Sequence, residues 1–98
     1  MTKSAHVYRI TLEQVSSKND ETPMQTPLKF EFGNHDDIFS IIEKMKQTDL
    51  FNQANESTEF ALGLKLFSEV ILKNKSHPLF EEIYPALGSF MKKLKSST

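Results

Sequence analysis

The chain lacks cysteine and tryptophan and contains only three glycines among its 98 residues. Without cysteine it has no disulfide framework, no thiolate metal site and no cysteine nucleophile. The three glycines stand at positions 33, 63 and 88, too far apart for a glycine-rich loop that cradles phosphate. The 12 Lys and Arg residues nearly balance the 13 Asp and Glu residues, giving a formal net charge of −1. A dedicated nucleic-acid binder carries a basic excess, so we expect no nucleic-acid partner.

Long apolar segments are also missing. The first six residues lack the apolar core of a secretory signal. No apolar run approaches the roughly 18 residues that a membrane-spanning helix needs. We therefore expect a cytoplasmic protein without a membrane partner. Hydrophobic residues still make up 38% of the chain, which favours a folded domain over a disordered chain.

The length of the chain suits a single domain over residues 1–98. Its ends are expected to be loosely held, with a flexible N-terminus at residues 1–5 and a frayed C-terminus at residues 96–98. A polar stretch at residues 16–26, which contains Pro23, predicts a mobile loop. We see no internal repeat and no domain boundary.

Apolar and polar residues alternate on both sides of this loop, which is typical of half-buried strands. The first alternating segment covers about residues 6–15 and the second about residues 27–33. Their inward positions are Tyr8, Ile10 and Leu12 in the first segment and Leu28, Phe30 and Phe32 in the second. Two strands in matching phase joined by a loop predict an antiparallel β-hairpin.

After Gly33 the apolar period changes to that of a helix, and three helices are predicted at about residues 35–48, 56–74 and 78–95. Asn34 is the expected N-cap of the first helix, with Asp36 and Asp37 in its first turn. The connection after this helix contains Leu50 and Phe51, which we expect to pack on the core.

The second helix is apolar on most of its surface, so we expect it to be central. Gly63 within it predicts the close approach of another element, because glycine weakens a helix interior. The third predicted helix starts at Pro78 and carries Pro85 inside its pattern, where we expect a kink or a restart.

These elements predict an α+β fold in which the β-hairpin packs against three helices. The expected core is Tyr8, Ile10, Leu12, Phe30, Phe32, Ile38, Ile41, Ile42, Phe60, Leu64, Phe67, Val70, Ile71, Ile83, Leu87 and Phe90.

The run His35, Asp36 and Asp37 is the most polar stretch next to a predicted element. A histidine beside carboxylates is suited to acid–base chemistry or to cation binding. Helix capping explains the two aspartates equally well and is the simpler interpretation. Only His35 is not required by capping.

A second candidate surface is the charged strip formed by Lys65, Glu69 and Lys73 on the second helix. Such a strip is suited to a partner or an anionic ligand. A solvated face held by i,i+4 pairs explains the same spacing, and we favour it.

His6, His35 and His77 are far apart in the sequence and show no metal-ligand spacing. We therefore predict no metal site, no cofactor and no catalytic residue. Whether these three histidines converge in the fold is left open by the sequence.

Several segments resemble a family of small bacterial proteins catalogued as a domain of unknown function. They include Tyr8-Arg9-Ile10-Thr11, the run from Phe32 to Phe39, and Gly63-Leu64-Lys65-Leu66-Phe67. The run Phe90-Met91-Lys92-Lys93-Leu94-Lys95 fits as well. The resemblance implies a single-domain bacterial protein of the cytoplasm and brings no activity, ligand or functional residue with it.

Two functions remain open. The first, which we favour because no catalytic constellation is present, is a non-enzymatic protein-interaction module. Its partner is another protein or a second copy, joined in a homodimer through the edge of the hairpin. The alternative is a small-molecule-binding protein or enzyme with a cleft near His35, Asp36 and Asp37.

Overall fold

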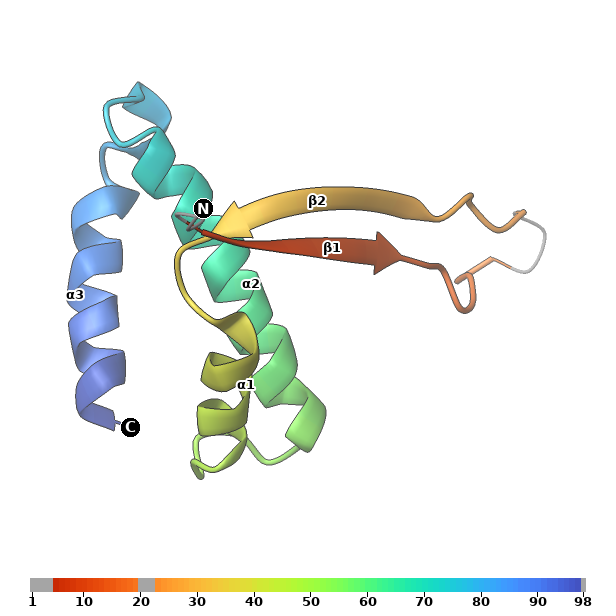
Figure 1. The fold of residues 1–98 in the computed structure, drawn as a ribbon, viewed down its shortest axis with the longest axis horizontal. Helices are drawn as coiled ribbons and strands as arrows, with labels where there is room; N and C mark the ends of the chain where they lie inside the picture. The colour runs from red at the N-terminus through yellow and green to blue at the C-terminus, as the bar shows by residue number, and fades with distance from the viewer. Residues whose placement is uncertain (1–4, 20–22, 98) are drawn as a thin grey trace. The chain divides into compact units, whose positions relative to one another are not determined.

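The computed structural model describes residues 5–19 and 23–97 (Figure 1). Its elements, in chain order, are β1 (His6–Leu12), β2 (Leu28–Asn34), α1 (Ile38–Lys46), α2 (Ala54–Lys73), the short 3-10 helix η1 (Pro78–Phe80) and α3 (Ile83–Ser97). The predicted α+β order, a hairpin followed by helices, is confirmed. The predictions for the N-terminus, the loop and the C-terminus fall partly on residues 1–4, 20–22 and 98, which lie outside the described residues.

The chain divides into two compact units. The first unit ends at Asp36 and contains the hairpin, and the second begins at Asp37 and contains the helices. A single domain over residues 1–98 stays a prediction.

The two strands of the hairpin are antiparallel and lie side by side (Figure 1). The register places Tyr8 opposite Phe32, Ile10 opposite Phe30 and Leu12 opposite Leu28. Because side chains alternate between the faces of a strand, these six apolar residues share one face, as the alternation predicts. β1 ends at Leu12 rather than near residue 15, and Val15, which is out of phase, is 90% exposed.

The apolar face of the hairpin is more exposed than the sequence suggests. Leu12 is 65% exposed, Leu28 57% and Phe30 40%. The prediction that Leu12 and Phe30 belong to the core is therefore wrong, while Tyr8, Ile10 and Phe32 are half-buried. A two-stranded sheet gives its side chains few neighbours, which is why such hairpins need further packing to be stable.

Helix α1 begins three residues later than predicted, and its N-cap is Asp37 rather than Asn34. The carboxylate of Asp37 accepts hydrogen bonds from the backbone N–H of Ser40 at 3.3 Å and from its hydroxyl at 3.0 Å. Asn34 instead accepts from the backbone N–H of Asp36 at 2.9 Å. Asn and Asp both accept hydrogen bonds from nearby backbone N–H groups through a side-chain oxygen, which suits either residue to a cap or a turn. The sequence therefore did not show which of the two caps the helix.

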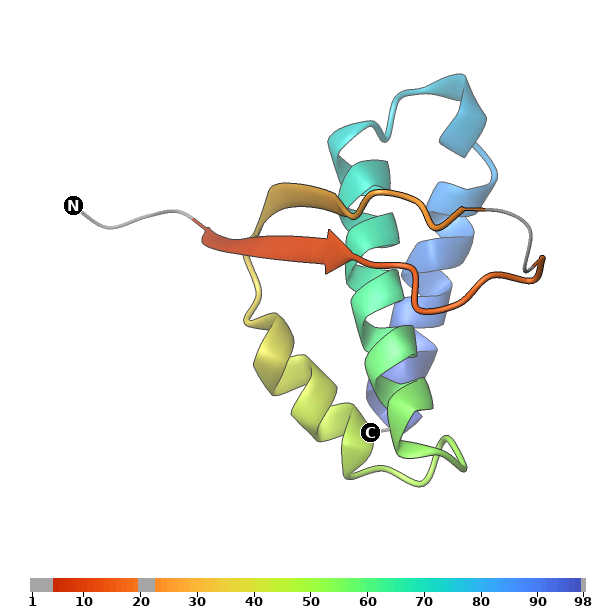
Figure 2. The same cartoon turned by 90° about the vertical axis from the view of Figure 1, so that its right-hand side faces the viewer.

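Helix α2 contacts both α1 and α3, which confirms that the second helix is central (Figure 2). The figures show α2 and α3 running in opposite directions. Phe51 in the connection before α2 packs on Phe60, with ring centroids 5.2 Å apart, so the expected anchoring of this connection is confirmed for Phe51.

The buried face of α2 is formed largely by small residues. Ser57, Ala61 and Ser68 are buried together with Ile71, whereas Phe67 and Val70 are about half exposed. The Ser57 hydroxyl donates a hydrogen bond to the Met45 carbonyl at 3.3 Å. Small side chains let neighbouring helices approach closely, and this preference is not visible in a hydrophobicity pattern.

Among the described residues, the buried apolar ones are Ile38, Met45, Ala61, Ile71 and Leu87. Of the predicted helical core, Ile38, Ile71 and Leu87 are buried, and Ile41, Ile42, Phe60 and Leu64 are half-buried. Phe67, Val70, Ile83 and Phe90 were wrongly predicted as core, because they are 37–53% exposed.

The third helical segment restarts ahead of Pro85 instead of continuing from Pro78. Pro78 opens η1, and His77 caps it by accepting the backbone N–H of Leu79 at 3.0 Å on its Nδ1. Pro85 is the third residue of α3, where a backbone N–H would have no partner within the helix. The restart thus places the proline where it costs no hydrogen bond.

Gly63 lies in the interior of α2 and is exposed. Apart from its chain neighbours and the adjacent backbone of α2, a Cβ at this position would meet no atom within 4 Å. The predicted close approach of another element at this position is therefore wrong.

Among the described residues, no helix is long and apolar enough to cross a membrane.

Candidate functional site

The run His35, Asp36 and Asp37 forms the bend between β2 and α1. The backbone carbonyl of Asp36 accepts a hydrogen bond from the Tyr8 hydroxyl at 3.2 Å. Asp37 caps α1, and all three residues are exposed. The contacts of the two aspartates shape the turn and the helix start, and a role of this run in binding stays a prediction.

The charged strip Lys65, Glu69 and Lys73 lies along α2. Glu69 and Lys73 form an i,i+4 ion pair, with 3.9 Å between Oε1 and Nζ. Lys65 also lines a groove between α2 and α3, together with Tyr84 and Met91. An i,i+4 pair of this kind occurs on solvated helix faces, and a role of the strip in binding stays a prediction.

The three histidines have separate surroundings. The ring of His6 lies 6.1 Å from that of Tyr8, His35 lies in the bend after β2, and His77 caps η1. Within residues 5–19 and 23–97, no three His, Asp or Glu side chains form a group that could hold a metal ion.

The hairpin offers a different kind of site, which is its unpaired strand edges. The sheet has two strands, so within the described part of the chain each strand has one edge with no neighbouring strand. The free N–H and C=O groups of such an edge are a template for another strand. Natural proteins cover or disrupt an edge of this kind, or use it for assembly.

The polar face of the hairpin carries charges in register. Arg9 lies opposite Glu31, and its Nε and Nη2 atoms contact one carboxylate oxygen of Glu31 at 3.1 and 2.5 Å. Lys29 lies two residues before Glu31 on β2, opposite Thr11. No carboxylate among the described residues lies within 4.0 Å of the Lys29 ammonium.

The β2 edge therefore combines an apolar face with two opposite charges on its other face. The alternation of residues 27–33 already indicates that Lys29 and Glu31 point away from the apolar face. The register with Arg9 cannot be read from that alternation, because it depends on how the loop closes the hairpin. The sequence already suggests the hairpin edge as a pairing surface, and the structure adds the register of its charges. A role of this edge in binding stays a prediction.

Comparison with known proteins gives a family and a fold. Residues 6–96 match the model of DUF3861, described as a domain of unknown function with a solved structure. The fold is similar to the crystal structure of a protein of unknown function from Pectobacterium atrosepticum, with a TM-score of 0.80 and 35% sequence identity. The similarity covers 94% of this chain and 98% of that one. No curated protein matches the chain.

Proposed function

Because the chain belongs to the DUF3861 family of domains of unknown function, its role must be inferred from its own surfaces, and we propose that it is a protein-interaction module. It forms a homodimer in which the β2 edges of two copies pair in antiparallel fashion around a two-fold axis. The observation that carries the proposal is the spacing of Lys29 and Glu31 on either side of Phe30.

A two-fold axis through Phe30 sets the register of the joined strands. In this register, Lys29 lies opposite the partner's Glu31, and Glu31 lies opposite the partner's Lys29. Opposite charges directly across two antiparallel strands stabilise the pairing by about 0.2–1 kcal/mol for each pair. The β2 edge is therefore complementary to itself in charge.

The neighbouring registers with the same face orientation are disfavoured. An axis through Lys29 places two ammonium groups opposite each other, and an axis through Glu31 does the same for two carboxylates. Like charges in these positions are destabilising. A slip by a single residue is excluded as well, because it would turn the apolar residues of one copy to the polar face of the other.

The same register extends the apolar face across the dimer. Phe30 meets the partner's Phe30, and Leu28 meets the partner's Phe32. Leu28 and Phe30 are 57% and 40% exposed in the isolated chain, so both have surface to bury against a partner. Aromatic and aliphatic cross-strand pairs of this kind stabilise sheets.

The ladder between the copies has a natural end at Pro27. Proline has no backbone N–H, so the residue before Leu28 cannot donate a hydrogen bond to a neighbouring strand. The intermolecular ladder then covers residues 28–32. The result is a four-stranded sheet, which is more stable than an isolated hairpin.

The β1 edge supports a second copy less well. An axis through Arg9 places two guanidinium groups opposite each other, and an axis through Ile10 pairs Arg9 with the partner's Thr11 without a charge pair. Pairing β1 with the partner's β2 is a heterologous contact, because the free edge of each copy can make the same contact again, so it continues as an open chain and does not close as a dimer. These comparisons favour β2 with β2.

The test is sedimentation velocity of the full chain over a concentration series that reaches about 100 μM, because mass action populates a weak dimer only at high concentration. We expect a monomer–dimer equilibrium. K29E replaces two attractive pairs with two repulsive ones and should weaken the dimer about tenfold or more, from the pair energies above. A chain that stays monomeric at every concentration overturns the proposal.

The register has a test of its own. E31K alone should also weaken the dimer, because it places Lys29 opposite a second cation. A mixture of K29E and E31K should restore association, because both cross-strand pairs are then of opposite charge. K75E is the matched control, since it makes the same charge change at an exposed position outside the strands and should leave the equilibrium unchanged. If the mixture associates no better than either variant alone, the register is wrong.

A further inference from the structure

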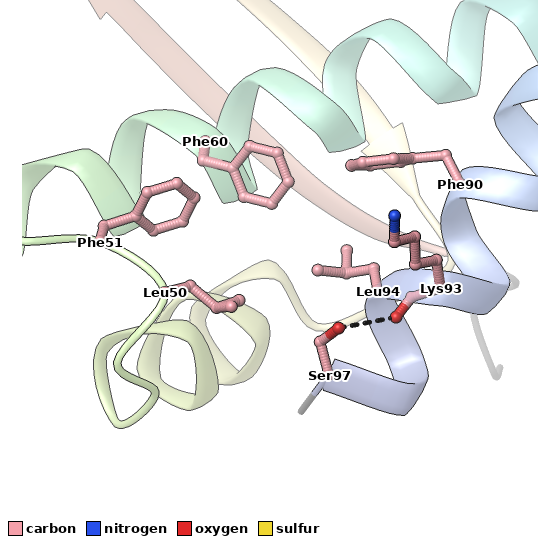
Figure 3. A pocket seen from close by; sticks show the side chains of 7 residues that line it. All are labelled: Leu50, Phe51, Phe60, Phe90, Lys93, Leu94 and Ser97. Atoms are coloured by element: carbon pink, nitrogen blue, oxygen red, sulfur yellow. Dashed lines mark hydrogen bonds between the residues drawn. The ribbon is translucent and has the colours of Figure 1, made fainter.

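The helical unit contains a cavity of about 300 Å³, which falls at the lower end of the range of small-molecule sites. It lies where the connection after α1 meets α2 and the C-terminal half of α3 (Figure 3). The lining residues are Leu50, Phe51, Phe60, Phe90, Lys93, Leu94 and Ser97.

Aromatic rings from three parts of the chain form the wall. Phe51 and Phe60 have ring centroids 5.2 Å apart, and Phe60 and Phe90 meet edge to face at 6.1 Å. Phe51 comes from the connection, Phe60 from α2 and Phe90 from α3. Leu50 and Phe90 are each 42% exposed, so part of the apolar wall remains open to solvent.

Among the described residues, Lys93 is the only charged one that lines this cavity. Its side chain extends from α3 between Phe90 and Leu94 (Figure 3). Within the described part of the chain, no carboxylate lies within 4.0 Å of its ammonium group. The Ser97 hydroxyl donates its hydrogen to the backbone carbonyl of Lys93 at 2.9 Å, so the ammonium of Lys93 is the group at this rim that is suited to donate to an anion.

We propose that this cavity binds a small amphipathic carboxylate, with its hydrocarbon or aromatic body against the phenylalanines and its carboxylate on the Lys93 ammonium. The apolar wall selects the body of the ligand. The Lys93 ammonium at the rim favours a ligand that carries one negative charge. The site is independent of the hairpin edge, because all of its residues belong to the helical unit.

Other ligand classes fit the lining residues less well. No acidic residue and no histidine of the described ranges lines the cavity, so these residues offer no ligand set for a metal ion. A nucleotide would bring several negative charges to one ammonium group and has no glycine-rich loop for its phosphates. An organic cation would be repelled by Lys93. A monoanion with an apolar body matches both features.

The test uses octanoate as the probe, with octanol and octylammonium as its neutral and cationic counterparts. Titrations of the ¹⁵N-labelled chain should shift the amide signals of Phe60, Phe90 and Leu94 with octanoate. We expect octanol to bind about tenfold more weakly, which is the effect of losing a hydrogen bond to a charged group. Octylammonium should bind more weakly than octanol.

K93Q should weaken octanoate about tenfold and leave octanol unchanged. K92Q is the matched control, because it removes the adjacent charge on the same helix without touching the cavity lining. S97W adds bulk at the rim and should weaken both probes while leaving the fold intact, since Ser97 is exposed at the helix end. The proposal is overturned if octanoate and octanol bind equally well, or if K92Q weakens octanoate binding as much as K93Q does. It is also overturned if the amide signals that shift belong to residues outside the cavity lining.

Discussion

Gly63→Ala should stabilise the protein. Gly63 lies in the interior of α2 with a negative φ, so an alanine can adopt its backbone conformation. A Cβ at this position meets nothing within 4 Å, so the substitution introduces no steric cost. In a helix interior, alanine is more favourable than glycine by about 0.8–1.0 kcal/mol, because glycine loses more backbone entropy on folding.

The expected size of the effect can be measured by thermal unfolding followed by circular dichroism at 222 nm. A gain of about 1 kcal/mol corresponds to a rise in Tm of roughly 4–8 °C for a domain of this length. Urea unfolding should move its midpoint upward with the m-value unchanged, because the substitution alters no buried surface. Gly88→Ala in α3 should act in the same direction, since a Cβ there also meets nothing within 4 Å.

The reverse substitution at a buried position provides the control. Ala61→Gly on the same helix should destabilise by more than the helix-propensity difference, because the Ala61 methyl group is fully buried. A loss of stability in Gly63→Ala would refute the reasoning. It would mean that another part of the molecule, or a second copy, closes on the outer face of α2 in solution.

Three further substitutions test the packing, the cap and the ion pair. Ile71→Ala removes the largest fully buried side chain and should cost about 2–5 kcal/mol in urea unfolding, with Ile71→Val costing about 0.5–1.5. Asp37→Ala should cost about 1 kcal/mol and speed amide exchange at Ser40, whereas Asp37→Asn should keep most of the cap; equal losses in the two would argue against capping. Arg9→Ala should cost less than about 1 kcal/mol, because its pair with Glu31 is exposed, and the difference should shrink in 1 M NaCl.

The order and type of the elements could be predicted from the period of the apolar residues. Alternation gave both strands, and the change of period after Gly33 gave the helices. The exact starts could not be predicted, because Asn34, Asp36 and Asp37 are all good turn and cap residues and only the backbone decides among them. At Pro85 the sequence predicted either a kink or a restart of the helix, and the structure has the restart.

The packing of the core was less predictable than the order of the elements. On α2 the largest residues were expected inside, yet Ser57 and Ser68 are buried and Phe67 is half exposed. Hydrophobicity measures the cost of exposure and does not measure how closely two backbones must approach. Serine satisfies a close contact when its hydroxyl finds an acceptor on the backbone, as the hydroxyl of Ser57 does on Met45.

The candidate sites differ in how far the sequence could reveal them. The polar clusters near His35 and on α2 could be found from the types of their residues. Residue type alone does not show whether such a cluster caps a helix, forms ion pairs or binds a ligand. The charges of the β2 edge are visible in the sequence as Lys29 and Glu31, and the structure adds their register with β1. The cavity is lined by residues from three segments, and Leu50 and Ser97 lie 47 positions apart along the chain. Sites assembled across elements in this way leave no local pattern.

The thin packing of α3 has a consequence for the dynamics of the helical unit. Leu87 is the only buried residue among those described in this helix, whereas α2 is held on both sides. Elements with few buried contacts open at a lower free energy than the rest of a domain. Helix α3 should therefore act as a separate unit of local unfolding that detaches while α1 and α2 remain paired. A ligand in the cavity would bridge α3 to α2 and raise the free energy of that opening.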